Sequence, residues 1–125
     1  MRDFGVRTAN NMKKHETGRN CDNSDCNGGL YDSIINFGEK LRTEDYHKGV
    51  QHGNSSDLML ALGSSLLVSP ANDMARGAIY NKGNLVICNL QKTALDKEAS
   101  LVIHCKLDDL FTRLMAKLEL PIPTW

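Results

Sequence analysis

Three short apolar runs in the second part of the chain constrain its fold more than any other feature. Leu58–Leu62, Leu85–Leu90 and Leu101–His104 are rich in apolar residues without a regular polar alternation. A strand that is apolar on both faces is typical of a parallel sheet covered by helices on both sides. The chain is therefore predicted to contain three strands of an open α/β sheet.

Helical patterns separate these strands. Asn72–Lys82 has apolar residues at helical spacing and is followed by Gly83, a typical C-terminal stop. A second helix is expected to begin at Asp108, where acids suit the helix dipole, and to end at Pro121. Its predicted apolar face consists of Leu110, Phe111, Leu114, Met115 and Leu118. This β-α-β-β-α order is typical of part of an α/β sheet.

Composition divides the 125-residue chain into a polar part, 1–56, and a more apolar, periodic part, 57–125. The segment 43–51 is a candidate for another helix, and the link "TALDKEAS" at 93–100 is predicted to contain one helical turn. Lys+Arg and Asp+Glu number 15 each, so no overall field indicates nucleic acid or an anionic membrane. The apolar runs are too short to span a bilayer, and no signal peptide is expected.

The cysteines suggest a metal site that is only half present. Cys21 and Cys26 flank four small polar residues in "CDNSDC", whereas structural zinc requires four protein ligands. Cys88 and Cys105 lie in strand patterns and are interpreted most simply as small core residues. His15 could complete a mixed site, but a solvated histidine in a basic "KKH" turn is the simpler interpretation. The missing pair is therefore expected upstream or on another chain.

Small polar residues follow the first two predicted strands. Gly63, Ser64 and Ser65 come after the first, and Asn89 and Gln91 come after the second. In open α/β sheets, ligands bind beyond the carboxyl ends of the strands. Glycine permits close approach of the backbone, and the polar side chains can bond ribose or phosphate oxygens. Each motif alone is also consistent with an ordinary turn or a polar strand end.

Four motifs in this order resemble the sirtuin family. They are "HETGRNC-x4-C-x-G-x-L-x-DSIINFGE-x-L", "SDLMLALGSSLLVSPA", "LVICNLQKTALDKEASLVIH" and "LMAKLELPIPTW". The resemblance covers nearly all of the chain and is strongest to the class IV branch, which holds the sixth and seventh members of the nuclear sirtuins. Several independent motifs in register make it specific.

The resemblance implies a partial Rossmann-type parallel sheet with part of a small zinc-binding module. Residues 57–125 would be the C-terminal part of the NAD-binding domain, and 1–56 part of the zinc module and a substrate-binding linker. Sirtuins hold zinc with two cysteine pairs, of which Cys21 and Cys26 match the second. "MRDFGVRTA" at 1–9 resembles the segment after the first pair. The chain is therefore expected to correspond to the C-terminal half of a sirtuin catalytic domain.

The resemblance also implies roles for individual residues. Gly63, Ser64 and Ser65 match the turn that contacts the NAD ribose; Asn89, Leu90 and Gln91 match the stretch around the adenosine ribose; Leu107 matches a residue whose backbone N–H reaches adenine; and Phe37, Gly38 and Glu39 match the segment that pairs with the acyl-lysine peptide. The branch usually has glycine where this chain has Cys105, and a side chain there would crowd the adenine pocket.

The implied function is that of an NAD-dependent protein-lysine deacylase, which transfers the acyl group to ADP-ribose and releases nicotinamide. The family's catalytic histidine and glycine-rich phosphate loop have no counterpart here, so no catalytic residue is assigned and the isolated chain is expected to be inactive. The alternative is a non-catalytic sirtuin-like module that binds nucleotide weakly or a protein partner. The resemblance further implies NAD and zinc as cofactors, an acyl-lysine protein substrate such as a histone, and a nuclear location. Membrane and direct nucleic-acid binding are not indicated.

Overall fold

The computed structural model describes residues 14–123, so the segment 1–9 lies outside the described residues. The chain forms two compact units, Met1–Arg42 and Thr43–Trp125, and each is described by itself. By its packing, the segment 43–56 belongs with the second unit. The functional boundary expected after residue 56 stays a prediction.

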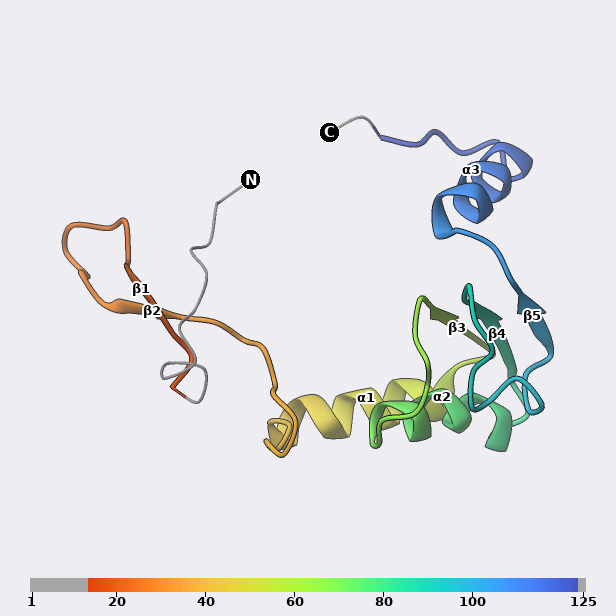
Figure 1. Cartoon of the computed structure of the whole chain (residues 1–125), viewed down its shortest axis with the longest axis horizontal. Coiled ribbons are helices and arrows are strands. Elements are labelled where there is room, and N and C mark those ends of the chain that lie inside the picture. Colours follow the sequence, from red (N-terminus) through yellow and green to blue (C-terminus); the bar gives the residue numbers. More distant parts are fainter. Residues whose placement is uncertain (1–13, 124–125) are drawn as a thin grey trace. The chain divides into compact units, whose positions relative to one another are not determined.

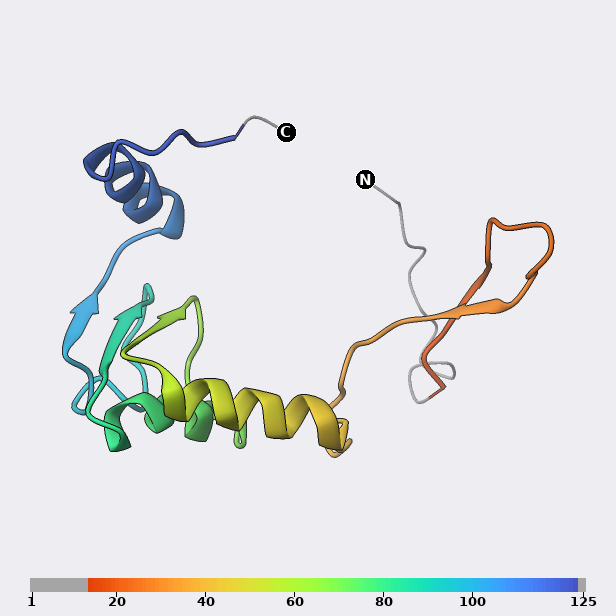
Figure 2. The same cartoon turned by 180° about the vertical axis from the view of Figure 1, so that it is seen from behind.

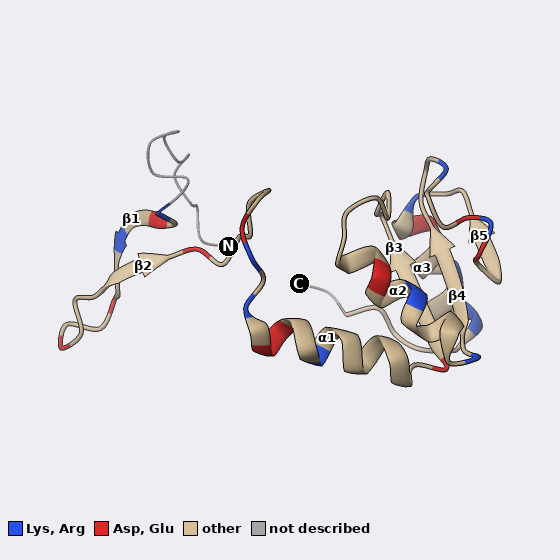
Figure 3. Cartoon of the chain, turned by 90° about the horizontal axis from the view of Figure 1, so that it is seen from below, with Lys and Arg blue, Asp and Glu red and all other residues tan. Residues whose placement is uncertain are grey.

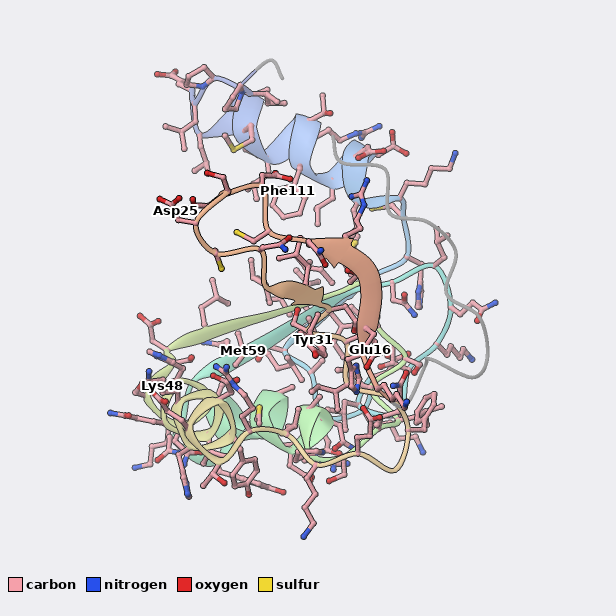
Figure 4. The ribbon with its side chains drawn as sticks, turned by 90° about the vertical axis from the view of Figure 1, so that its left-hand side faces the viewer. Glu16, Asp25, Tyr31, Lys48, Met59 and Phe111 are labelled. Carbon is pink, nitrogen blue, oxygen red and sulfur yellow. The ribbon has the colours of Figure 1, made fainter. Side chains whose placement is uncertain are left out.

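The described part of the first unit is a small hairpin. β1 (Glu16–Asn20) pairs antiparallel with β2 (Gly29–Tyr31), and an irregularity separates the Glu16–Tyr31 pair from the Asn20–Gly29 pair. Figure 4 labels Glu16 and Tyr31 on these strands. The Thr17 hydroxyl reinforces the pairing by donating to the Leu30 carbonyl at 2.6 Å. No residue within 14–42 is buried, so polar contacts hold this unit together.

A three-stranded parallel sheet forms the centre of the second unit. β3 (Leu58–Leu62), β4 (Asn84–Cys88) and β5 (Leu101–Ile103) lie in the order β3-β4-β5. Leu62 is opposite Cys88, and Cys88 is opposite Ile103. The three predicted strands are confirmed, with ends displaced by at most two residues. Such displacements are within the usual uncertainty of element ends.

Two helices lie on the same side of this sheet, as Figures 1 and 2 show from opposite directions. They are α1 (Thr43–Ser55), which is longer than the segment predicted from 43 to 51, and α2 (Ala71–Tyr80), which confirms the predicted helix within two residues. Acidic residues in the first turn of α1 suit the helix dipole and are coloured red in Figure 3. α2 contributes to the core, whose buried members are Ala61, Leu66, Ala75, Leu85, Ile87 and Leu95.

The opposite face of the sheet is apolar but open. Leu58, Leu60 and Leu101 are 53%, 44% and 51% exposed. The sequence predicts helices on both faces, yet residues 43–123 place α1 and α2 on one face only. The apolar strands thus predicted correctly that this face is apolar. They did not predict that the described residues leave it uncovered. Among the described helices, none has the length and apolar character needed to cross a membrane.

The last helix, α3 (Leu107–Lys117), ends before Pro121, so the predicted end was wrong. Glu119 adopts a left-handed conformation with φ 57°, and the Leu120 N–H donates to the Met115 carbonyl at 3.0 Å. This is a Schellman-type termination, which satisfies a terminal carbonyl without help from proline. The predicted apolar face is partly covered: Leu110, Phe111 and Met115 are half-buried, and Leu114 and Leu118 are exposed.

The link between β4 and β5 contains the one helical turn that was predicted. The Ala99 N–H donates to the Leu95 carbonyl at 3.1 Å, and the Leu95 side chain is fully buried. Asp96 Oδ1 accepts bonds from both the hydroxyl and the N–H of Thr93, at 2.6 and 3.1 Å. The turn thus anchors the connection in the core.

Candidate functional site

The carboxyl ends of β3 and β4 meet at one edge of the sheet. The Gly63 N–H donates to the Cys88 carbonyl at 2.9 Å, which extends the β3–β4 ladder by one bond. Gly63 has a φ of 61°, a left-handed conformation that favours glycine. A Cβ on Gly63 would lie 3.5 Å from Leu107 Cδ1. The turn after β3, the end of β4 and the start of α3 therefore come together.

The two serines that follow Gly63 are exposed. Ser64 Oγ accepts a hydrogen bond from the Leu66 N–H at 3.3 Å, and its hydroxyl hydrogen can still be donated. The Ser65 carbonyl accepts from the Ala94 N–H at 3.3 Å, which ties this turn to the loop after β4. The Leu66 side chain is buried in the core and anchors the turn there. The turn is thus fixed while its hydroxyl groups remain accessible.

Asn89 is held firmly at the end of β4. Its N–H donates to the Ile103 carbonyl at 3.1 Å, and its carbonyl lies 2.9 Å from Nδ1 of His104. Its side-chain Nδ2 donates to the Gln91 carbonyl at 2.9 Å. The side-chain Oδ1 can therefore accept a hydrogen bond from a ligand. Leu90 and Gln91 are exposed. The structure thus brings the predicted nucleoside-binding residues of 63–65, 89–91 and 107 to one edge.

Cys88 and Cys105 form a thiol pair at this edge that sequence reasoning did not find. Their Sγ atoms are 3.8 Å apart, and the Cys88 Sγ lies 3.7 Å from the Cys105 carbonyl oxygen. Cys88 is fully buried, as predicted, whereas Cys105 is only half-buried. Burial, followed by the neighbouring Cys88 thiol, raises the pKa of Cys105 above its ordinary value. No local pattern signals a pairing across 17 residues.

The candidate metal ligands, Cys21 and Cys26, occupy the hairpin loop of the first unit. The Cys21 N–H donates to the Gly28 carbonyl at 2.7 Å, and the Cys26 N–H donates to the Asn23 carbonyl at 3.0 Å. These bonds fold 21–28 into a compact turn, with Cys21 half-buried and Cys26 exposed. Both thiols are free, but no cluster of three or more potential metal ligands occurs in 14–123. Within 14–123, these two thiols are two of the four ligands that a structural zinc would require.

His15 belongs to a polar cluster and is not a freely solvated side chain. Its Nδ1 lies 3.1 Å from Asp32 Oδ1, and its Nε2 lies 3.2 Å from Glu39. The hydrogen bond that the ring donates to the Asp32 carboxylate, aided by Glu39, raises the pKa of His15 above its ordinary value. Both ring nitrogens face carboxylates, so neither of the sequence-based interpretations, a zinc ligand or a solvated side chain, describes this residue.

The same cluster orders the predicted peptide-binding segment. Hydrogen bonds from the Asn36 side chain and N–H, at 3.0 and 2.8 Å, lower the pKa of Glu39. Gly38 has a φ of 88°, and the Phe37 side chain is 92% exposed. Glu39 thus fixes one end of a turn that presents Phe37 to solvent. Whether this turn pairs with a peptide stays a prediction.

Sequence comparison finds relatives that are named as NAD-dependent protein deacetylases. It is 34% identical over 125 residues to the NAD-dependent protein deacetylase SRT1 of Arabidopsis thaliana, covering 100% of this chain and 26% of that protein. It is also 34% identical over 131 residues to the NAD-dependent protein deacetylase sirtuin-7 of Homo sapiens, covering 100% of this chain and 32% of the relative. The chain thus spans about a quarter to a third of these relatives.

Solved structures support the same relationship. A complex described as Sir2-p53 peptide-NAD+ matches with a TM-score of 0.68 and 32% identity, over 80% of this chain and 41% of that chain. Sir2 bound to acetylated peptide matches with a TM-score of 0.70 and 31% identity, over 82% and 42% of the two chains. The Sir2 family model matches residues 3–70, more than half of the sequence. The chain, with its Rossmann-like parallel sheet, therefore belongs to the Sir2 family.

Proposed function

We propose that this chain functions within an NAD-dependent protein-lysine deacylase that transfers the acyl group to the ADP-ribose part of the cofactor. The observation that carries the proposal is the gathering of Gly63, Asn89 and Leu107 at the carboxyl edge of a parallel sheet, where nucleotides bind in such folds. Similar Sir2 structures contain NAD+ with a peptide, or 2'-O-acetyl-ADP-ribose with a deacetylated peptide.

Each part of this edge has a chemical role in the proposal. The left-handed turn at Gly63 allows the backbone to approach a ribose closely, and the Ser64 and Ser65 hydroxyls donate to ribose or phosphate oxygens. Asn89 Oδ1 accepts from a ribose hydroxyl, while Leu90 and Gln91 line the same rim. The Leu107 N–H, at the start of α3, is assigned to adenine.

The first unit is proposed to bind the protein substrate. The segment 37–39 offers an exposed aromatic ring and backbone groups that are suited to pairing with an extended acyl-lysine peptide. The hydrogen bonds that join Glu39 to His15 and Asn36 hold this segment in its turn. A histone-type substrate and a nuclear location are part of the same proposal and rest on the family relationship.

Zinc is proposed as a structural cofactor of the first unit. Cys21 and Cys26 would supply two thiolate ligands, and the backbone bonds of 21–28 hold them on one short turn. Bound zinc would link this turn to further ligands and so stabilise a unit that has no buried residue within 14–42.

A binding experiment tests the nucleoside edge directly. ADP-ribose is titrated into the purified chain and followed by backbone amide NMR, with shifts expected at 63–65, 89–91 and 107. Asn89→Ala is expected to weaken binding by roughly 2- to 12-fold, the equivalent of about 0.5–1.5 kcal/mol for one hydrogen bond. Gln51→Ala, an exposed change on α1, is the matched control and should leave the affinity unchanged. Unchanged affinity in Asn89→Ala would contradict the assignment.

The second candidate function is a non-catalytic module that binds nucleotide weakly or a protein partner. It is supported by the accessible hydroxyl groups of Ser64 and Ser65 and by Asn89 Oδ1, which can bond a nucleotide without a catalytic group beside them. Both candidates predict no nicotinamide release by the isolated chain. Transcript sequence upstream of the Met1 codon separates them. An open frame that encodes a cysteine pair and a glycine-rich loop supports the deacylase, and a stop codon there supports the module.

A further inference from the structure

The thiols of Cys88 and Cys105 are in contact without being bonded. Their sulfur atoms are 3.8 Å apart, whereas a disulfide requires about 2.05 Å, so closure needs an approach of roughly 1.8 Å. Cys88 is the last residue of β4, and Cys105 lies between β5 and α3. The two residues thus occupy neighbouring strand ends, where only a small movement separates the dithiol from the disulfide.

The backbone around the pair is held in register. Cys88 is opposite Ile103 in the parallel ladder, and the Asn89 N–H donates to the Ile103 carbonyl at 3.1 Å. The contact between His104 Nδ1 and the Asn89 carbonyl, at 2.9 Å, adds a second tie between the two strand ends. These bonds keep the sulfur atoms near each other and limit alternative partners for either one.

We propose that Cys88 and Cys105 form a redox-active dithiol that hydrogen peroxide converts into a disulfide at the nucleoside edge. Among the described residues, this pair has two features that are typical of such a site. It has one half-buried thiol that can meet the oxidant, Cys105, and one fully buried thiol in contact with it, Cys88.

The chemistry proceeds in two balanced steps. The Cys105 thiolate attacks one peroxide oxygen, the O–O bond breaks, and hydroxide leaves, so Cys105 becomes a sulfenic acid. The Cys88 sulfur then attacks the Cys105 sulfur, the S–S bond forms, and the S–O bond breaks. The hydroxyl group leaves with the proton from Cys88 as water. Overall, two thiols lose two electrons and two protons, and one peroxide becomes two waters.

The charges around Cys105 make this reaction dependent on pH. Burial, the Cys88 thiol and Asp109 each raise the pKa of Cys105, whereas Arg113 lowers it. Because the thiolate is the reactive form, disulfide formation should be slow near neutral pH and faster as the pH rises. Asp109→Asn should accelerate the reaction at neutral pH, and Arg113→Gln should slow it.

Closure of the disulfide would change the proposed nucleoside edge. Cys88 lies inside the ladder, so the approach of the two sulfurs is expected to move Cys105 and the connection to α3. Leu107 begins α3 two residues later, and its Cδ1 lies 3.5 Å from the Cβ position of Gly63. The disulfide is therefore expected to weaken nucleoside binding, a consequence that rests on the proposed function.

Peptide mapping tests the dithiol without any assay of function. The purified full chain is treated with hydrogen peroxide, quenched with an alkylating reagent and digested with trypsin under non-reducing conditions. Cleavage at the intervening lysines places Cys88 and Cys105 on different peptides. We expect a linked peptide that dithiothreitol releases. Recovery of both residues as separate alkylated peptides, with Cys21 and Cys26 oxidised, would overturn the proposal.

Variants show whether the folded geometry selects the pair. Cys105→Ser should abolish the linked peptide completely, whereas Cys26→Ser should leave it in place. The wild-type chain in denaturant is the control, because an unfolded chain pairs its four cysteines with little selectivity. Equal linkage of all cysteines under native conditions would contradict the pairing, and circular dichroism confirms that Cys105→Ser is folded.

ADP-ribose affinity tests the effect on the nucleoside edge. Oxidation should weaken binding severalfold in the wild-type chain, with recovery after dithiothreitol, and should have no effect in Cys105→Ser. A linked peptide with unchanged affinity would overturn the regulatory part of the proposal. If the reduced chain fails to bind ADP-ribose while the linked peptide forms, the proposed function fails and the dithiol stands.

Discussion

The two units of this chain are held together in different ways. Within 43–123, the second unit buries Leu85, Ile87 and Leu95 completely and packs α2 against its sheet. The described part of the first unit, 14–42, has no buried residue and relies on hydrogen bonds around a hairpin and on the cluster at His15. Apolar burial supplies most of the stability of a folded domain, and single hydrogen bonds add little net free energy.

This difference indicates which perturbation each unit should respond to. The second unit should be sensitive to loss of apolar volume and insensitive to metal chelation. The first should respond to metal, pH and the loss of individual polar contacts. The proposed NAD-binding residues lie on the unit with the core, and the proposed peptide and zinc residues lie on the other. Four experiments test this separation, in order of decreasing expected effect.

The largest effect is expected from Leu85→Ala. Leu85 is fully buried on β4, so its truncation leaves a cavity and should lower the free energy of unfolding of the second unit by about 2–5 kcal/mol. Urea denaturation followed by circular dichroism measures this loss. Leu101→Ala on β5 is the matched control and should cost less, because its side chain is 51% exposed. Equal losses for the two variants would contradict the assignment of the core.

The next effect is expected at the contact between α1 and α2. A Cβ on Gly53 would lie 2.4 Å from the Met74 carbonyl oxygen, which is backbone and cannot move alone. Gly53→Ala should therefore destabilise the second unit by about 1–3 kcal/mol. Gly49→Ala meets the flexible Met74 side chain, at 2.7 Å from its Sδ, and should be close to neutral because alanine favours the helix. Equal costs would show that the helices adjust freely.

A metal experiment probes the first unit. Cys26→Ser should reduce bound zinc and lower the amide protection of 16–31, because one of the two available thiolate ligands is lost. The unfolding transition of the second unit should remain unchanged. Cys105→Ser serves as the thiol control and should retain zinc. Elemental analysis measures the bound zinc, and hydrogen exchange measures the amide protection. A loss of second-unit stability in Cys26→Ser would contradict the independent response of the two units.

The smallest effect is expected from pH. Because the folded-state pKa of His15 is raised above 6.5, its contribution is fully present below pH 6.5 and is lost as the pH rises through the folded pKa. Glu39 has a lowered pKa, so its contribution is present above pH 4.5 and is lost as the pH falls through the folded pKa. Protection of the first unit should therefore be highest between these two transitions.

Replacement of His15 tests how much of this pH dependence of amide protection comes from His15. His15→Gln should remove the decline of protection at higher pH, and His47→Gln, on α1 of the other unit, should not. NMR titration of the imidazole resonances provides a separate measurement. A pKa for His15 at or below 6.5 would show that the carboxylates do not hold the ring in its protonated form.

Local patterns predicted much of the fold. The apolar runs predicted the three strands of the parallel sheet but not the hairpin strands β1 and β2. Helical spacing predicted α2 and the start of α3, and the link at 93–100 contains the expected turn. The end of α3 could not be predicted from Pro121, because Glu119 adopts a conformation that glycine usually takes. The sequence also predicted helices on both faces of the sheet, whereas α1 and α2 lie on one face. The apolar character of a strand does not indicate which of its faces the described residues cover.

Motif order by itself indicated the family, which the match of the Sir2 family model to residues 3–70 confirms. It also indicated which turns to examine for nucleoside binding. Tertiary structure alone decided which of these residues meet. The contact of Gly63 with Leu107, the pairing of Cys88 with Cys105 and the placement of His15 between two carboxylates each join residues at least 17 positions apart. Their proximity depends on strand register and loop path, which arise from packing of the whole unit and leave no periodic signal in the sequence.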